Sequence, residues 1–278
     1  MPTPDGARRP AHALLTEAAA RRDDPAPRPP ARPRVGVDLG TASCVLVVLD
    51  DDTPVWVESV ASGALHDGVV VDFARAVATV RGLRDRAQEA LGVPLARAAT
   101  AYPPCVPAAD ARACTYVCET AGFDAVTLVD EVSAAQRTLE VTDGVVVDVG
   151  GGSTGIGVFR DGALVRLDDR PGGGHHLDLV LAGALGIELE EAERVKRERP
   201  AEALGILIPG LERIAESVRA MTTAIDDPDA AELPLHLAGG ALMIPRADDV
   251  LAAYLQRTVV THPHALLITP LGIARSCP

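Results

Sequence analysis

Aromatic residues and long apolar runs are scarce in this 278-residue sequence. Aromatic residues make up 3% of the chain and apolar residues 47%, so a core must be built mainly from Val, Leu, Ile and Ala. No apolar run approaches the ~18 residues that a membrane-spanning helix needs, and the first residues lack the apolar segment of a secretory signal. We therefore expect a cytoplasmic protein with no membrane partner.

Cysteine and positive charge are also in short supply. The five cysteines form no CxxC pair, which favours reduced, buried thiols over a disulfide framework. A metal site built from Cys105, Cys114, Cys118 and a histidine stays an alternative, although the spacing does not support it. The net charge is −13, and such an acidic chain is a poor partner for nucleic acid.

One phrase occurs almost identically twice in the chain. It is written VGVDLGTAS over residues 35–43 and VVVDVGGGST over residues 145–154. In each copy an apolar strand ends in an aspartate, Asp38 or Asp148, and a glycine turn with Ser or Thr leads into a second strand. The repetition predicts two copies of one α/β unit that begins with a β-hairpin.

The repeated turn suggests a phosphate site that includes a metal ion. Backbone N–H groups in a glycine turn can hold phosphate oxygens, but an adjacent carboxylate repels phosphate unless a cation lies between them. Mg²⁺ suits this position because it keeps several waters and takes one or two carboxylates. Two facing turns would hold a polyphosphate from both sides, with Asp38 and Asp148 near the hydrated metal. Ordinary hairpin turns are the alternative, which the repetition of the whole pattern disfavours.

Two rival phosphate motifs fit less well. The sequence contains no GxxxxGK[ST], so no P-loop is predicted. GGGSTG at residues 150–155 matches GxGxxG, and Asp168 follows at about the distance of the acidic residue in a dinucleotide-binding fold. That fold requires a helix directly after the glycines, whereas IGVFRDGALVRL predicts a hairpin.

The chain divides into a tail and two series of strands and helices. Residues 1–33 are rich in Pro, Arg and Ala, which is typical of a disordered tail or linker. Residues 11–22 can form one short helix there, either as a docking peptide or as part of a solvated tail. Strands alternate with amphipathic helices from residue 34, and this alternation starts again at Gly144. In the second series the spacing of apolar residues predicts a helix over 210–225.

Five segments in this order resemble the actin / DnaK-type chaperone / sugar-kinase ATPase superfamily. The two repeated phrases resemble its phosphate loops, LVDEVSAAQ its first connecting helix, LHLAGGALMIP its adenosine loop and ITPLGIA its closing helix. The resemblance implies an actin-like α/β fold in which two ribonuclease-H-like lobes, with mixed five-stranded sheets and flanking helices, surround a nucleotide cleft. It places lobe I at 34–143, lobe II at 144–265 and a C-terminal helix that returns to lobe I at 266–278. Segments such as HDGVVVDF and GGGHHLDLVLAGALGI most resemble the EutJ family of ethanolamine-utilisation proteins, which are associated with bacterial microcompartments.

The resemblance also implies roles for individual residues, with ATP and Mg²⁺ as the bound groups. The implied phosphate-binding residues are Gly40, Thr41 and Ala42 on one side and Gly150, Gly151, Gly152 and Ser153 on the other. Asp38 and Asp148 would hold the metal through water, Glu131 would orient the attacking water, and these three would be the catalytic residues if hydrolysis occurs. The implied adenosine-binding residues are Glu193, Lys196, Gly239 and Gly240. Lys196 is the single lysine of the chain, beside 25 arginines.

The sequence departs from the chaperone pattern at several catalytic positions. Gly155 stands where the chaperones carry Asp, Ala42 where they carry a second Thr, and the first lobe contains no lysine. Fewer groups would stabilise a transferring phosphoryl group, so we expect nucleotide binding with weak or absent ATPase activity. For His175 and His176, a hydrogen-bonding role at the start of a helix is favoured over catalysis.

The implied function is that of a chaperone or assembly factor in ethanolamine utilisation, associated with a microcompartment. Its ligands would be ATP and ADP, and its client would be an ethanolamine-pathway enzyme or a shell protein. The alternatives are a reactivase for a cobalamin-dependent lyase, a nucleotide-binding filament or scaffold that forms homo-oligomers, and a small-molecule kinase of the same fold.

Overall fold

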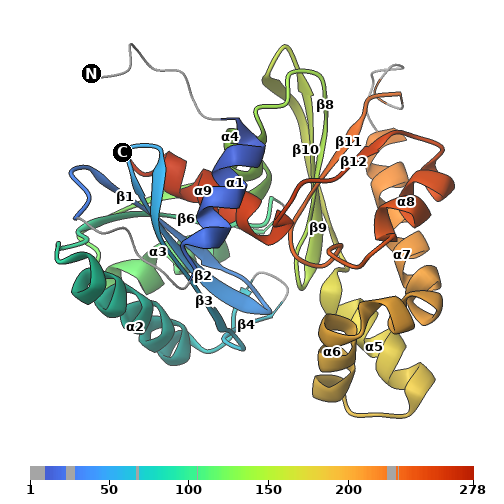
Figure 1. Cartoon of the computed structure of the whole chain (residues 1–278), viewed down its shortest axis with the longest axis horizontal. Helices are drawn as coiled ribbons and strands as arrows, with labels where there is room; N and C mark the ends of the chain where they lie inside the picture. Colours follow the sequence, from blue (N-terminus) through green and yellow to red (C-terminus); the bar gives the residue numbers. More distant parts are fainter. Residues whose placement is uncertain (1–9, 23–28, 67–68, 105, 224–229, 231) are drawn as a thin grey trace.

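The computed structural model describes residues 10–22, 29–66, 69–104, 106–223, 230 and 232–278 (Figure 1). Each half of the sequence builds one five-stranded sheet, in the orders β3-β2-β1-β6-β7 and β10-β9-β8-β11-β12. In both sheets two antiparallel hairpins are followed by two parallel strands. We call each sheet with its helices lobe I and lobe II. The predicted α/β fold with two like lobes is confirmed.

The sheet of lobe I is buried on both faces. Along β2, Leu46 and Val48 pack into the core under α2 and α3, whereas Val45 and Val47 pack into the core under α4 and α9. Burial on both faces explains why this strand is a nearly continuous apolar run. The strands are β1 (Pro33–Leu39), β2 (Ser43–Asp50), β3 (Thr53–Ala61), β6 (Arg97–Tyr102) and β7 (Ala125–Asp130).

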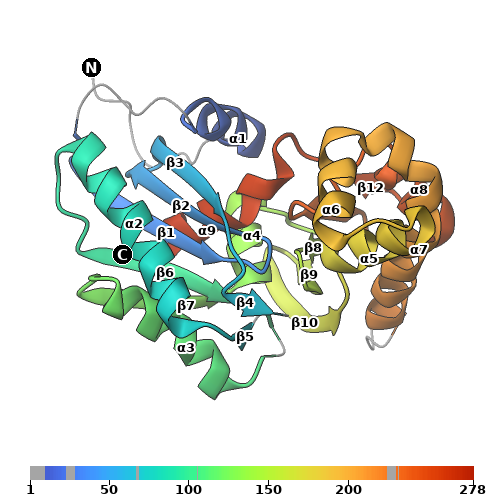
Figure 2. The same ribbon diagram turned by 90° about the horizontal axis from the view of Figure 1, so that it is seen from below.

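The helices of lobe I lie on the two faces of this sheet (Figure 2). The longest, α2, begins at Asp72, whose carboxylate accepts a hydrogen bond from the backbone N–H of Arg75, and ends at Gly92 with a φ of 68°. Both are standard helix boundaries. The remaining elements are α2 (Phe73–Leu91), α3 (Ala108–Thr120), α4 (Glu131–Leu139) and the short pair β4 (Leu65–His66) and β5 (Val69–Val70).

Lobe II repeats the hairpins of lobe I. Its second hairpin turns at Asp161 and Gly162, with φ values of 49° and 74°, which is the conformation of a tight two-residue turn and explains the Asp-Gly pair. The strands are β8 (Gly144–Val149), β9 (Ser153–Arg160), β10 (Ala163–Pro171), β11 (Leu235–Ala238) and β12 (Val259–Val260). The helices are α5 (Gly174–Leu185), α6 (Leu189–Glu198), α7 (Pro200–Thr223) and α8 (Ala247–Leu255).

Helix α7 is longer than the sequence predicts. The predicted helix started at residue 210, but α7 starts at Pro200 and continues through Pro209. Proline removes one backbone hydrogen bond inside a helix, which is why the sequence suggested a boundary there. Leu207 and Leu211 are both fully buried in the core of lobe II, and this burial holds the helix together across the proline.

Two short helices, α4 and α9 (Ile268–Ser276), cross next to the sheet of lobe I (Figure 1). A Cβ atom built at Gly272 of α9 would overlap the carbonyl oxygen of Ala134 in α4, so only glycine allows this crossing. Helix α9 also lies directly on β1, because a Cβ atom at Gly36 would come within 2.5 Å of the backbone nitrogen of Ala274. The short helix η2 (Ala265–Leu267) precedes α9.

The N-terminal segment differs from the expected tail. Residues Ala11–Ala20 form α1, and Leu14, Leu15 and Ala18 are fully buried against β2, β3 and the start of α9. The expectation of disorder therefore fails for this helix, and residues 1–9 and 23–28 lie outside the described residues. Within the described residues no helix has the length and apolarity to cross a membrane.

Candidate functional site

The two repeated glycine turns adopt the same local geometry and face each other. The N–H of Gly40 donates to the carbonyl of Ser43 at 3.0 Å, and the N–H of Gly150 donates to the carbonyl of Ser153 at 3.0 Å. A Cβ atom at Gly151 would lie 3.2 Å from the backbone nitrogen of Ala42, so the turns of the two lobes are in contact. The sequence repeat is thus a structural repeat that brings two glycine turns together.

A cleft with a volume of about 760 Å³ lies at this contact. Residues of both lobes line it, and every residue to which the sequence analysis gave a site role is among them. They are Asp38, Gly40, Thr41, Ala42, Glu131, Asp148, Gly150, Gly151, Gly152, Ser153, Glu193, Lys196, Gly239 and Gly240. The structure therefore gathers the predicted residues in one place, while their roles remain predictions.

Three of the predicted site residues are carboxyl groups with raised pKa values. Burial, and then the charge of Asp148, raises the pKa of Asp38 to about 7. Burial raises the pKa of Asp148 to about 6, although a hydrogen bond from Thr269 opposes this shift. Burial, followed by the charges of Asp148 and Asp38, raises the pKa of Glu131 well above its usual range. These carboxylates repel one another, and a cation would relieve the repulsion.

The cleft fits a hydrated divalent cation better than a dehydrated one. Among the described residues none of the three carboxylates has an ion-pair partner, and no cluster of three or more His, Cys, Asp or Glu side chains could enclose a metal. Mg²⁺ bound through water to one or two carboxylates and to phosphate oxygens needs no such cluster. Asp38 and Asp148 could hold the ion in this way beside the two glycine turns.

The third glycine segment follows β11 and packs against Asp148. Gly239 has a φ of 84°, and a Cβ atom there would lie 2.5 Å from Oδ1 of Asp148. A side chain is therefore excluded at this position by both conformation and space. The neighbouring Gly240 packs against Leu266, and both line the cleft.

The start of α5 is hydrogen-bonded to the second glycine turn. The N–H of Gly174 donates to the carbonyl of Gly150 at 2.9 Å, and the N–H of His175 donates to the carbonyl of Gly151 at 2.8 Å. The ring of His175 meets the ring of His66 of lobe I edge to face, with 6.1 Å between the ring centroids. His175 therefore contributes its backbone to the turn, as expected of a residue at a helix start.

Lys196 is held by a residue that the sequence analysis missed. Its ammonium group lies 2.6 Å from Oδ1 of Asp178 and donates to the carbonyl of Gly174 at 2.9 Å. The two side chains are 11% and 8% exposed. Glu193, the other implied adenosine-binding residue of this helix, pairs with Arg197 at 2.6 Å and also lines the cleft. The signal for Asp178 was a lone acid inside the apolar helix LDLVLAGAL.

Asp169 is a second residue that was missed. It lies opposite Gly155 in the β9–β10 pairing, and its Oδ1 would be 3.5 Å from a Cβ atom at Gly155. Burial raises its pKa to about 7, with the charge of Asp148 adding to the shift. A carboxylate of the neighbouring strand thus lies beside position 155, although Asp169 is not among the residues that line the cleft.

The described cysteines are buried and form no disulfide. Cys44, Cys114, Cys118 and Cys277 are free, and burial raises the pKa of each thiol. Cys105, part of the alternative metal site, lies outside the described residues. The predicted reduced, buried thiols are confirmed for the four that the structure describes.

Two family models match parts of the chain. The MreB/Mbl protein model matches residues 53–183, and the cell division protein FtsA model matches residues 145–259. The FtsA protein of Rhizobium meliloti is also similar to this chain, with 48% identity over 50 residues. That match covers 18% of this chain and 11% of FtsA, so it concerns one segment.

Longer matches are found among ethanolamine utilization proteins. The EutJ protein of Salmonella typhimurium strain LT2 is 37% identical over 244 residues, covering 87% of this chain and 85% of EutJ. The EutJ protein of Escherichia coli strain K12 is 36% identical over the same length.

Solved structures show the same relationship. The EutJ crystal structure from Carboxydothermus hydrogenoformans superposes with a TM-score of 0.88 at 39% identity and covers 95% of this chain and 98% of that chain. MreB5 of Spiroplasma citri bound to ADP superposes with a TM-score of 0.70 at 16% identity, covering 88% of this chain and 95% of that chain. The MreB5 likeness concerns the fold alone, and it establishes the actin-like ATPase fold.

Proposed function

Because this chain belongs to the EutJ family of ethanolamine utilization proteins, we propose that its cleft binds Mg²⁺·ATP and that nucleotide binding controls an assembly or chaperone role in this pathway. The observation that carries the proposal is the meeting of two equivalent glycine turns beside carboxylates that have no ion-pair partner among the described residues. Glycine turns supply N–H donors for phosphate, and the carboxylates supply the charge that attracts a metal. The MreB5 structures bound to ADP and to AMPPNP support nucleotide binding by this fold.

In this proposal the parts of the cleft have separate roles. The turns at Gly40–Ala42 and Gly150–Ser153 hold the phosphates, and bound Mg²⁺ neutralises phosphate charge. Asp38 and Asp148 face the hydrated ion. The Lys196–Asp178 pair lines the part of the cleft that would receive the nucleoside. Gly239 leaves room for backbone contact there.

We expect hydrolysis to be slow. The lysine of the cleft is engaged by Asp178 and Gly174, and lobe I supplies none. The sequence also departs from the chaperone pattern at Ala42 and Gly155, so fewer groups would stabilise a transferring phosphoryl group. We therefore assign nucleotide binding to this cleft and expect turnover to be secondary.

Calorimetry with Mg²⁺·ATP tests the proposal. Asp148→Ala should weaken binding about 5- to 150-fold, the equivalent of about 1–3 kcal/mol for one charge-assisted contact. Asp249→Asn is the control, because Asp249 is an exposed acid on α8 that pairs with Arg246 away from the cleft. Equal affinity in wild type and Asp148→Ala would contradict the metal role.

The relatives are named as ethanolamine utilization proteins, and the assembly role is our own proposal, which a separate experiment tests. Sedimentation with and without Mg²⁺·ATP, alone and with ethanolamine-pathway enzymes or shell proteins, separates a client-binding factor from a filament. Co-sedimentation that needs both nucleotide and client supports the assembly role. Nucleotide-dependent pelleting of the chain alone favours a filament or scaffold.

A further inference from the structure

Asp148 is hydrogen-bonded to a residue that comes 121 positions later in the chain. The hydroxyl of Thr269, in the first turn of α9, donates to Oδ2 of Asp148 at 2.6 Å. Both residues are buried, with exposures of 5% and 7%, and both line the cleft. On its other side, Oδ1 of Asp148 lies against the backbone of Gly239. The carboxylate is therefore restrained at both oxygens.

We infer that Thr269 is a positioning residue that holds Asp148 in the orientation required for Mg²⁺-dependent nucleotide binding. The inference rests on the proposed function. A carboxylate that binds a hydrated ion through water must present its lone pairs in a defined direction, and a short hydrogen bond from a buried hydroxyl fixes that direction.

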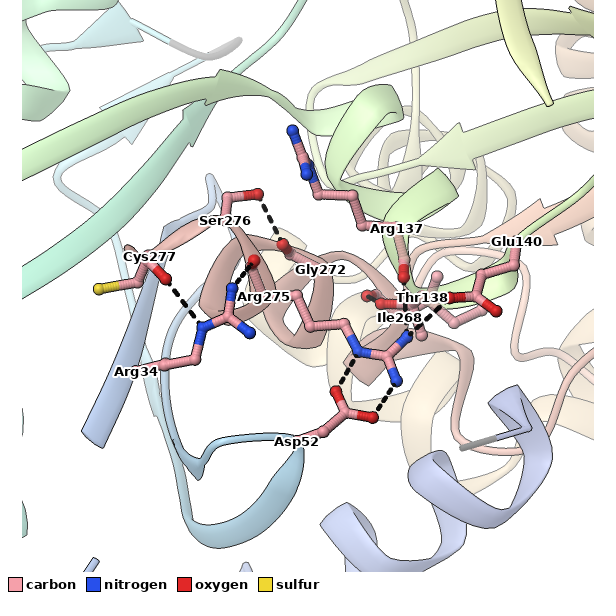
Figure 3. A network of polar contacts seen from close by, with 10 residues as sticks. All are labelled: Arg34, Asp52, Arg137, Thr138, Glu140, Ile268, Gly272, Arg275, Ser276 and Cys277. Atoms are coloured by element: carbon pink, nitrogen blue, oxygen red, sulfur yellow. Dashed lines mark hydrogen bonds and ion pairs between the residues drawn. The ribbon is translucent and has the colours of Figure 1, made fainter. Parts of the chain in front are cut away.

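The C-terminal turn of α9 is fixed to lobe I by a buried arginine (Figure 3). Arg275 is 3% exposed, and its guanidinium binds both oxygens of Asp52 in the β2–β3 turn, at 2.6 and 2.7 Å. Its third nitrogen donates to the carbonyl of Arg137, near the end of α4, at 2.8 Å. A two-point guanidinium–carboxylate contact resists both sliding and rotation of the helix.

The N-terminal turn of α9 is fixed to α4 by a second threonine. The hydroxyl of Thr138 donates to the carbonyl of Ile268 at 2.7 Å (Figure 3), and Gly272 touches Ala134 one turn later. Helix α9 is thus held against lobe I at both ends, while Asp148 ends a strand of lobe II. The Thr269–Asp148 bond is a contact between the two lobes at the metal-facing carboxylate.

Calorimetry on matched threonine variants tests this inference. Thr269→Val removes the hydroxyl with little change of shape, and Thr269→Ser keeps it. Thr138→Val is the control. It removes a buried hydroxyl that donates to the carbonyl of Ile268, the residue before Thr269, and this hydroxyl does not contact Asp148. Each variant is titrated with ATP in Mg²⁺ and in EDTA, and its folding is checked by thermal melting.

We expect Thr269→Val to weaken binding of Mg²⁺·ATP about 5- to 30-fold and to leave binding of metal-free ATP within about twofold of wild type. Thr269→Ser should retain affinity close to wild type, and Thr138→Val should retain the Mg²⁺ dependence even where it lowers the melting temperature. Wild-type affinity in Thr269→Val, failure of Thr269→Ser to retain affinity, or an equal loss in Thr138→Val would overturn the inference. Absence of Mg²⁺·ATP binding in the wild type would instead overturn the proposed function.

Discussion

At the scale of single residues, the main feature of the cleft and its surroundings is repulsion among closely placed carboxylates. Asp38, Glu131, Asp148 and Asp169 all have raised pKa values, and each shift has burial as its largest cause. A folded-state pKa above the unfolded value means that the folded protein binds more protons. The metal-free protein therefore loses stability as these groups ionise, and a bound cation would restore it.

The pH dependence of Asp38→Asn tests this repulsion. The ordinary pKa of 3.8 rises to about 7 in the fold, so the stabilising effect of the protonated group is complete below about pH 4 and is lost as the pH rises through 7. Asn does not titrate, so the free energy of unfolding of Asp38→Asn should rise relative to wild type by about 1–2 kcal/mol between pH 5 and pH 8, discounted for partial exposure to the cleft. Urea unfolding in EDTA measures the difference, and a difference independent of pH would refute the repulsion.

Individual residues of the site could be predicted where the signal is local. Asp38 and Asp148 were predictable because each ends an apolar strand directly before a glycine turn. Thr269, Asp178 and Asp169 were not, because their roles depend on contacts between distant segments, such as the 121 residues that separate Thr269 from Asp148. The position of Asp169 opposite Gly155 also depends on the strand register, which shifts at an irregularity between Leu164 and Arg166.

At the scale of secondary-structure elements, the crossing of α4 and α9 brings two helices that carry cleft residues together. Glu131 begins α4, Thr269 lies in the first turn of α9, and the two helices touch at Gly272. Both helices thus carry cleft residues in their first turns. At Gly272 the backbone of α9 lies directly against the backbone of α4, with no side chain between them.

Gly272→Ala should destabilise the protein by about 3 kcal/mol, because its Cβ atom would overlap the carbonyl of Ala134 and force the helices apart. Gly205→Ala in α7 is the matched control, since a Cβ atom there meets no atom within 4 Å. Removing a glycine from a helix interior without a clash should stabilise the protein by about 0.5–1 kcal/mol. Urea unfolding of both variants measures the contrast, and similar effects would contradict the close crossing.

The repeated lobe pattern of the elements was predictable from the alternation of apolar strands and amphipathic helices. The start of α7 was not, because Pro209 is a helix breaker by local preference and only tertiary burial of Leu207 and Leu211 overrides it. The contact at Gly272 was also hidden, because a sequence does not show which glycine lies at a helix crossing.

On the scale of the whole molecule, α1 extends the core beyond the two lobes. Its buried leucines share a core with β2, β3, α4 and α9, so the helix covers apolar surface beside the connection between the lobes (Figure 2). The Pro- and Arg-rich sequence around α1 suggested a tail. The surface on which α1 packs could not be predicted, because its residues come from distant parts of the chain.

Leu15→Ala should lower the free energy of unfolding by about 2–3 kcal/mol, because it removes a fully buried side chain from this core. Thr16→Ala on the exposed side of the same helix should change it by less than about 0.5 kcal/mol. Chemical denaturation measures both. A Leu15→Ala variant as stable as wild type would show that α1 does not contribute to the folded core.

The molecule as a whole consists of two like lobes whose glycine turns meet at one cleft, and the central claim is that this cleft binds Mg²⁺·ATP. A crystal structure grown with Mg²⁺ and a non-hydrolysable ATP analogue tests it most directly. We expect the triphosphate to lie between Gly40–Ala42 and Gly150–Ser153, with the ion facing Asp38 and Asp148. An empty cleft at saturating nucleotide, or a nucleotide bound elsewhere on the protein, would contradict it.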